Sequence, residues 1–130
     1  MPSDYTETVE SFGTVYYKIY DEITKSQAIE KCQADGGRLP VPLDEDENTF
    51  FVDLIPDGQF YIWLGVNDNE NEAVWVHDNG NSLTWSNWAN WQAGTVHNAA
   101  VLSNFDTNWH NTPDPNSYTT ICCHVIYNDG

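Results

Sequence analysis

His97 and His110 are the two residues of this chain whose type and setting first suggest metal chemistry. Both lie in stretches rich in Asn, Pro and Gly, and Asp106 or Asp114 could lie near them if these loops fold together. Imidazole and carboxylate groups together are typical ligands of zinc. Neither a His-X-His nor a His-X-X-X-His spacing is present, so two surface histidines are the competing interpretation and the zinc signal is weak.

A run of acids from Asp44 to Glu47 is a second candidate for binding a cation. Acidic side chains are also stabilised at the start of a helix by the helix dipole, and Asp44 with Glu47 three residues later fits a capping pattern. We therefore interpret this run as the beginning of a helix. No Gly-X-Ser-X-Gly motif, phosphate-binding loop or dinucleotide fingerprint occurs, and no nucleophile stands beside a base, so the sequence predicts a protein that is not an enzyme.

The net charge limits the classes of partner. Twenty acidic residues against four basic ones give a formal charge of −16. This balance excludes nucleic acids and anionic membranes as partners. Cationic partners remain compatible with it, although surface acids most often only keep a protein soluble. No apolar stretch is long enough to cross a membrane, and no signal peptide is visible in the acidic N-terminus.

Two helices are predicted in the first half of the chain. A capping box opens the first helix at Thr24, and Gly36-Gly37 ends it. The second helix begins after Asp44 and stops at Pro56. Apolar residues at helical spacing form their inner faces: Ala28, Ile29 and Cys32 in the first helix, and Phe50, Phe51, Leu54 and Ile55 in the second.

Strand signals occupy four other segments, residues 12–20, 61–88, 101–105 and 119–127. Asn79-Gly80 marks a turn within the second of these. The order of one strand, two helices and then several strands predicts an α+β domain with an antiparallel sheet. Asn, Pro and Gly crowd the connections 89–100 and 108–118, and long loops on a compact scaffold commonly carry function.

Several motifs follow one another in a family-specific order. They are Ala28 four places before Cys32, the run Trp63-Leu64-Gly65, the segment LTWSNW at 83–88, the triplet around Trp109, and Ile121-Cys122. In this order they resemble the C-type lectin-like domains of the short form. The resemblance implies a single domain over residues 1–130 with its core at about 15–126, built from two helices, antiparallel sheets and a long-loop region. It also places five tryptophans in the core: Trp63, Trp75, Trp85, Trp88 and Trp109.

The three cysteines are read partly from composition and partly from this resemblance. Composition alone leaves one bridge and one spare thiol. The resemblance implies that Cys32 and Cys122 form the outer disulfide of the family, and that Ala100 and Asp114 replace its second disulfide. Cys123 follows Cys122 on a strand and so points to the opposite face. The family commonly has a surface acid there, which favours exposure, so a semi-buried free thiol and a disulfide-linked homodimer both stay open.

The calcium ligands of sugar-binding members are replaced by neutral groups. Counting from LTWSNW, the first ligand triplet falls on residues 92–94, the later acid becomes Asn98, and Trp109-His110-Asn111 stands where Trp-Asn-Asp is usual. Calcium needs six to eight oxygens, several of them charged. Residues 83–105 hold no carboxylate at all. No calcium cofactor is therefore predicted at this position.

Asp68 and Glu72 match two ligands of an auxiliary calcium site in the family. The other partners of that site fall on Thr95 and Ala99, which supply no charge. Asp68 and Glu72 are thus weak metal candidates, and the alternative is that they accept hydrogen bonds that organise a loop.

The resemblance implies a secreted or extracellular recognition module that binds a glycan or a protein through the loop region, residues 89–118. Its predicted contact residues are Trp91, Gln92, His97, Asn98, His110 and Asn111. Hydrogen bonds and aromatic contact would replace metal coordination there. Three alternatives stay open: an assembly protein dimerising through Cys123, calcium-dependent carbohydrate binding at a non-standard site, and ice binding, for which a regular array of Thr is missing.

Overall fold

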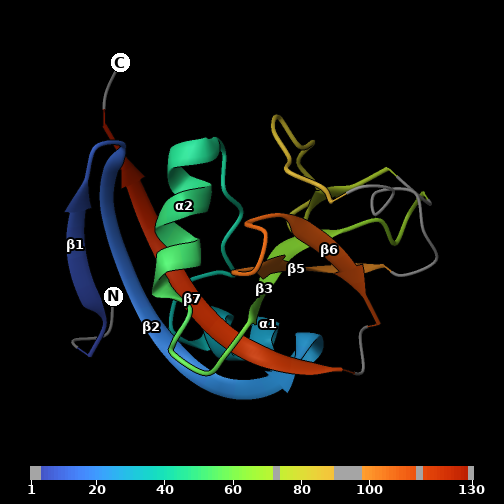
Figure 1. Ribbon diagram of the computed structural model, residues 1–130, viewed down its shortest axis with the longest axis horizontal. Coiled ribbons are helices and arrows are strands. Elements are labelled where there is room, and N and C mark those ends of the chain that lie inside the picture. The colour runs from blue at the N-terminus through green and yellow to red at the C-terminus, as the bar shows by residue number, and fades with distance from the viewer. Residues whose placement is uncertain (1–3, 72–73, 90–97, 114–115, 129–130) are drawn as a thin grey trace.

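The computed structural model describes residues 4–71, 74–89, 98–113 and 116–128 of the 130-residue chain. Along these ranges the elements are β1 (Thr6–Glu10), β2 (Gly13–Thr24), α1 (Lys25–Ala34), α2 (Glu45–Leu54), β3 (Tyr61–Asn67), β4 (Val76–His77), β5 (Ala99–Ser103), β6 (Trp109–Thr112) and β7 (Ser117–Tyr127). Figure 1 shows α1 and α2 on opposite sides of the long strand β7. The predicted α+β class is confirmed.

The strands join in one sheet in the order β1-β2-β7-β3-β5-β6, and β4 pairs with β3. β3 pairs with β7 in parallel, with Ile62 opposite Thr119. The sheet is therefore mixed and not antiparallel throughout, because strand direction depends on a long connection that local patterns do not specify. β1 was also not predicted. It is an edge strand on which Val9 is 76% exposed, so it lacks the alternating apolar face of a half-buried strand.

Both helices begin where their caps predict. The Thr24 hydroxyl accepts a hydrogen bond from the Gln27 backbone N–H, and the Gln27 side chain accepts one from the Thr24 N–H, which completes a capping box. The Asp44 carboxylate accepts from the Glu47 N–H. The Glu47 side chain does not close a second box, because it is buried and accepts a hydrogen bond from the Tyr127 hydroxyl at 2.8 Å.

The sheet separates two apolar clusters. The cluster on the α2 side contains alternate residues of β3 and β5, and the cluster on the α1 side contains the residues between them. Cys32 on α1 and Cys122 on β7 form the predicted disulfide inside the α1-side cluster. The core position is confirmed for Trp63, Trp75 and Trp109, whereas Trp85 and Trp88 are half-buried and pack against the α2-side cluster.

Residues 74–89 form a compact connection with little regular strand. The predicted Asn79-Gly80 turn is present, with Gly80 at a φ of 92° and the His77 N–H donating to the Asn81 carbonyl. The expected strand at 83–88 is wrong, since this segment makes only an isolated bridge from Trp88 to Trp109. Its aromatic residues instead pack by their rings: Trp75 on Trp88 at 4.6 Å, Trp88 on Trp109 at 5.5 Å and Trp85 on Trp109 at 6.0 Å. Neither helix among the described residues could span a bilayer.

Candidate functional site

Three of the six predicted contact residues lie among the described residues: Asn98, His110 and Asn111. Trp91, Gln92 and His97 lie outside them, as do Glu72 and Asp114. Asp68 is buried just after β3, with 2% of its surface exposed. Within the described ranges, no three His, Cys, Asp or Glu side chains come close enough together to hold a metal ion.

The strand β6 places His110 and Asn111 on different faces of the sheet. His110 lies opposite Val101 of β5, and Asn111 lies opposite Ala100. Because side chains alternate along a strand, Asn111 shares the α2-side face with Trp109, whereas His110 shares the α1-side face with Tyr61. The ring centroids of Tyr61 and His110 are 6.4 Å apart. His110 and Asn111 therefore do not present their side chains on one common surface of β6.

His110 forms a hydrogen bond with Asp106, which lies in the turn between β5 and β6. The His110 Nε2 atom lies 2.9 Å from the Asp106 Oδ2 atom. Partial burial alone would raise the pKa of Asp106, but hydrogen bonds from the Asn108 N–H and the His110 ring outweigh it and hold this pKa below its ordinary value. The carboxylate therefore accepts, Nε2 donates, and a neutral ring keeps Nδ1 as an acceptor.

Exposed aromatic rings lie next to this pair. Phe105 is 69% exposed and stacks on Phe60, which is 46% exposed, at a centroid distance of 4.7 Å. Tyr61 contacts the edge of the stack, at 6.4 Å from Phe105. No periodic pattern predicts this platform, because Phe60 precedes β3 and Phe105 lies in a turn. His110 and Asp106 are candidate neighbours from the sequence, whereas Phe60, Tyr61 and Phe105 are not.

Asn98 lies at a different place, in a polar groove of about 320 Å³ at the start of α1. Lys25 is buried there and donates to the Val66 carbonyl at 2.8 Å, and its Nζ lies 3.5 Å from Asp78 Oδ1. The Asn67 amide donates to the same Asp78 oxygen at 2.8 Å. The structure thus does not bring Asn98 together with His110 through any contact among the described residues.

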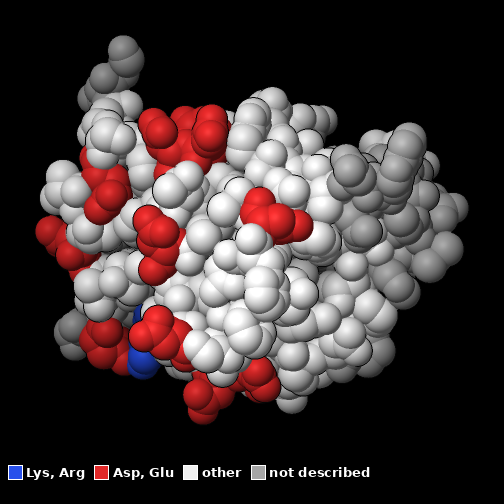
Figure 2. Space-filling view, in the orientation of Figure 1, with Lys and Arg blue, Asp and Glu red and all other residues white. Residues whose placement is uncertain are grey.

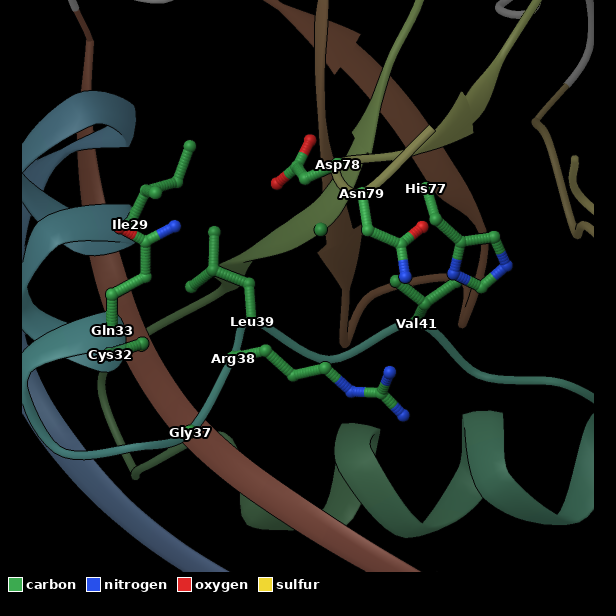
Figure 3. Close-up of a pocket in the computed structure, with 11 residues that line it drawn as sticks. Ile29, Cys32, Gln33, Gly37, Arg38, Leu39, Val41, His77, Asp78 and Asn79 are labelled. Carbon is green, nitrogen blue, oxygen red and sulfur yellow. The ribbon is translucent and has the colours of Figure 1, made fainter. Parts of the chain in front are cut away.

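A second cleft, of about 180 Å³, adjoins this groove and shares Ile29, Gln33 and Asp78 with it. It lies between α1, the segment 37–41, β3 and the turn after β4 (Figure 3). Gly65 makes the close packing possible, since a Cβ atom there would lie 2.9 Å from the Leu39 carbonyl oxygen. The Gly65 N–H donates to the Pro40 carbonyl at 3.0 Å, and the Asp78 N–H donates to the Gly65 carbonyl at 2.8 Å.

Arg38 and His77 are the polar residues of this cleft that sequence reasoning missed. Burial lowers the pKa of the His77 imidazole, the Arg38 guanidinium lowers it further, and Asp78 opposes both. Arg38 follows the glycine pair that ends α1, and His77 precedes the Asn79-Gly80 turn. Their positions beside two predicted turns are the only feature in the sequence that points to them. Turns can bring such residues together in space without any shared motif.

Cys123 requires a correction. Cys122 and Cys123 do point to opposite faces, but both faces are covered, and Cys123 is 1% exposed within the α2-side cluster. The segment after α1 covers this strand, because Arg38 and Cys123 exchange backbone hydrogen bonds of 2.9 and 2.8 Å. Burial raises the pKa of the thiol to about 12. The expected exposure is therefore wrong, and the sulfur is not available to a second chain in this conformation.

Two helices on either side of a mixed sheet, with a disulfide from the first helix to the last strand, define a lectin-like recognition fold. A sequence profile described as "Lectin C-type domain" matches residues 21–124. The chain belongs to this family, whose members are generally non-enzymatic recognition modules.

Relatives and solved structures agree with this assignment. Collectin-10 of Gallus gallus is 34% identical over 94 residues, which are 72% of this chain and 32% of the relative. Asialoglycoprotein receptor 2 of Mus musculus is 31% identical over 111 residues, 78% of this chain and 36% of the relative. The chain thus spans about a third of the length of these relatives.

Two solved structures share the fold at low identity. The carbohydrate-recognition domain of the mouse scavenger receptor C-type lectin superposes with a TM-score of 0.82 and 16% identity over 100% of both chains. A calcium-independent type II antifreeze protein superposes with a TM-score of 0.78 and 18% identity over 96% of this chain and 94% of that one. At these identities the likeness shows the fold alone.

Proposed function

We propose that this chain is an extracellular recognition module that binds a glycan or a protein by direct contact through the loop region, residues 89–118, without calcium at the position where the family's sugar-binding members hold it. The observation that carries this proposal is the Asp106–His110 pair at 2.9 Å, whose imidazole contacts Tyr61, the ring that also contacts the exposed Phe105. A fixed imidazole acceptor next to an aromatic plane can bind a sugar hydroxyl group or a peptide group without a metal.

The charge distribution supports contact without a metal. Only Asp106 and Asp114 are acidic among residues 89–118. On the face shown in Figure 2, the acidic side chains gather mainly over β1, β2 and α2. Asn98 and Asn111 offer amide oxygens and amide hydrogens, which suit hydroxyl and peptide groups better than a divalent cation.

The family comparisons support the same ligand classes. One solved structure of similar fold is described as the carbohydrate-recognition domain of cow CD23 in the presence of a GlcNAc2Man3 oligosaccharide. Another is described as calcium-independent, so this fold is compatible with loss of the metal. The Cys32–Cys122 disulfide supports a secreted or extracellular location, because such bonds persist in oxidising compartments. The burial of Cys123 speaks against the dimeric assembly role.

A glycan array read with a chelator and again with millimolar Ca²⁺ tests the proposal. We expect the same glycans to be bound in both conditions, and His110→Ala to weaken binding at least about fivefold through loss of its hydrogen bond. His124→Ala is the matched control, because His124 is an exposed histidine on β7. Binding that is lost with chelator and restored by Ca²⁺ would overturn the metal-free proposal, as would a Ca²⁺-dependent rise of several degrees in Tm.

A further inference from the structure

The basic side chains of this acidic protein differ in how they are engaged. All four lie between residues 18 and 38: Lys18, Lys25, Lys31 and Arg38. Lys18 pairs with Asp4, Lys25 with the Val66 carbonyl and Asp78, and Lys31 lies over the Tyr20 ring at 5.1 Å. The Arg38 guanidinium makes no hydrogen bond or ion pair with any residue that the structure describes. Arg38 is exposed, so its guanidinium donors can meet solvent or a ligand.

The cleft beside Arg38 has an apolar wall and further polar groups near the guanidinium. Ile29, Leu39 and Val41 supply the apolar wall of the roughly 180 Å³ space. Figure 3 shows the Arg38 side chain extending along the cleft toward the side on which Asn79 and His77 lie. The Asn79 Oδ1 atom already accepts from the Asn81 N–H at 3.0 Å, which leaves the Asn79 amide NH₂ group as a donor.

We propose that this cleft is a second ligand site, separate from the loop region, that takes a small carboxylate with an apolar body. The carboxylate lies on the planar fork of Arg38, which matches its two oxygens. His77 and Asn79 supply further donors, and the body of the ligand packs on Ile29, Leu39 and Val41. A concave, mainly apolar space with a few convergent polar groups is the usual form of a small-molecule site.

The net charge of the protein selects among anions. A formal charge of −16 repels multiply charged anions such as phosphates. A singly charged carboxylate meets less of this repulsion, and burial of its apolar body adds a favourable contribution that charge does not affect. Asp78 on the same wall is held by Lys25 and Asn67, so its carboxylate is already engaged.

The test is an NMR titration of the ¹⁵N-labelled chain with benzoate and with glucuronate, each compared with its neutral counterpart, benzamide and glucose. We expect the carboxylates to shift the amide signals of residues 37–39 and 77–79, and the neutral compounds to shift them far less. Arg38→Gln should weaken binding at least about tenfold, and Arg38→Lys should lie between it and the unchanged chain. Benzoate should bind more tightly than glucuronate because only its body is apolar, and a preference for glucuronate would overturn the apolar-body part of the proposal.

Lys31→Gln is the matched control, since it removes one positive charge at a residue of α1 that lies over the Tyr20 ring and does not line the cleft. Arg38→Gln keeps the backbone bonds between Arg38 and Cys123, and an unchanged Tm would show that the fold is retained. Equal shifts with benzamide and benzoate, equal binding by Arg38→Gln and Lys31→Gln, or no shift with either carboxylate would each overturn the proposal.

Discussion

The α1 side and the loop side of this molecule are stabilised by different interactions. On the α1 side, a disulfide joins Cys32 to Cys122 across 90 residues of sequence. On the loop side, the resemblance to the family implies that Ala100 and Asp114 replace its second disulfide, and no covalent link connects the described parts of that region. There, Trp109 is fully buried and donates its indole N–H to the Asn48 side chain at 2.8 Å. Aromatic packing and one helix residue thus serve where a crosslink is usual.

Two consecutive residues of the helix α2 contact different parts of the molecule, the loop side and the strand β7. Asn48 reaches the loop side, where its amide also donates to the Thr107 carbonyl at 2.8 Å. Glu47 reaches β7, where it accepts from Tyr127. Substitutions at the disulfide, at Asn48 and at Glu47 therefore separate the contribution of each half.

The largest effect is expected from removal of the disulfide. A crosslink closing a loop of 90 residues stabilises the fold by about 4–5 kcal/mol in the chain-entropy treatment. Cys32→Ala with Cys122→Ala should lower the free energy of unfolding by that order, measured by urea titration. Cys123→Ala is the matched control that leaves the bridge intact. Equal losses in the two proteins would mean that packing at the cysteines, and not the crosslink, stabilises this half.

A smaller and more local effect is expected at Asn48. Asn48→Ala leaves the Trp109 indole N–H without its protein partner, whereas the Thr107 carbonyl still accepts from the Asn87 amide. An orphaned buried polar group costs about 1–3 kcal/mol. We expect a loss of this order in the free energy of unfolding, with faster amide exchange in β5 and β6 than in α1. Thr49→Ala, at an exposed position on the same helix, controls for helix propensity. Uniformly faster exchange across both halves would contradict the division drawn here.

The predictions from sequence succeed where nearby residues or the order of family motifs determine the structure. Caps at Thr24 and Asp44 depend on neighbours three residues away, so local spacing was sufficient to place α1 and α2. The Cys32–Cys122 bridge and the core tryptophans followed from the order of family motifs. The parallel β3–β7 pair and the burial of Cys123 depend on which segments cover the sheet, which no local pattern encodes.

The candidate sites show a similar limit. His110 was predicted as a contact residue and Asp106 as a possible neighbour of it, whereas the Phe60–Phe105 stack beside the turn between β5 and β6 was not predicted. The cleft at Arg38 combines residues from α1, the following segment and the β4 turn. Such sites are assembled by tertiary packing, and their members carry no shared spacing in the sequence.

The smallest expected effect concerns Glu47 and is a change in how the free energy of unfolding varies with pH. Burial raises the pKa of this carboxyl, even though the Tyr127 hydroxyl bonds to it and favours the charged form. The folded state then binds more protons than the unfolded state between the ordinary pKa of Glu and the raised one. Stability contributed by this group is fully present below the unfolded pKa and is lost as pH rises through the folded pKa.

Glu47→Gln removes this titration and keeps an oxygen for the Tyr127 hydroxyl. We therefore expect the free energy of unfolding of the variant, relative to the unchanged chain, to increase as pH rises from 4 toward 7. Urea titrations at several pH values measure this difference. Asp44→Asn does not serve as a control, since Asp44 caps α2, whereas Asp53→Asn changes an exposed acid of the same helix. If the free energy of unfolding varies with pH in the same way for Glu47→Gln and for the unchanged chain, then burial does not penalise ionisation of Glu47.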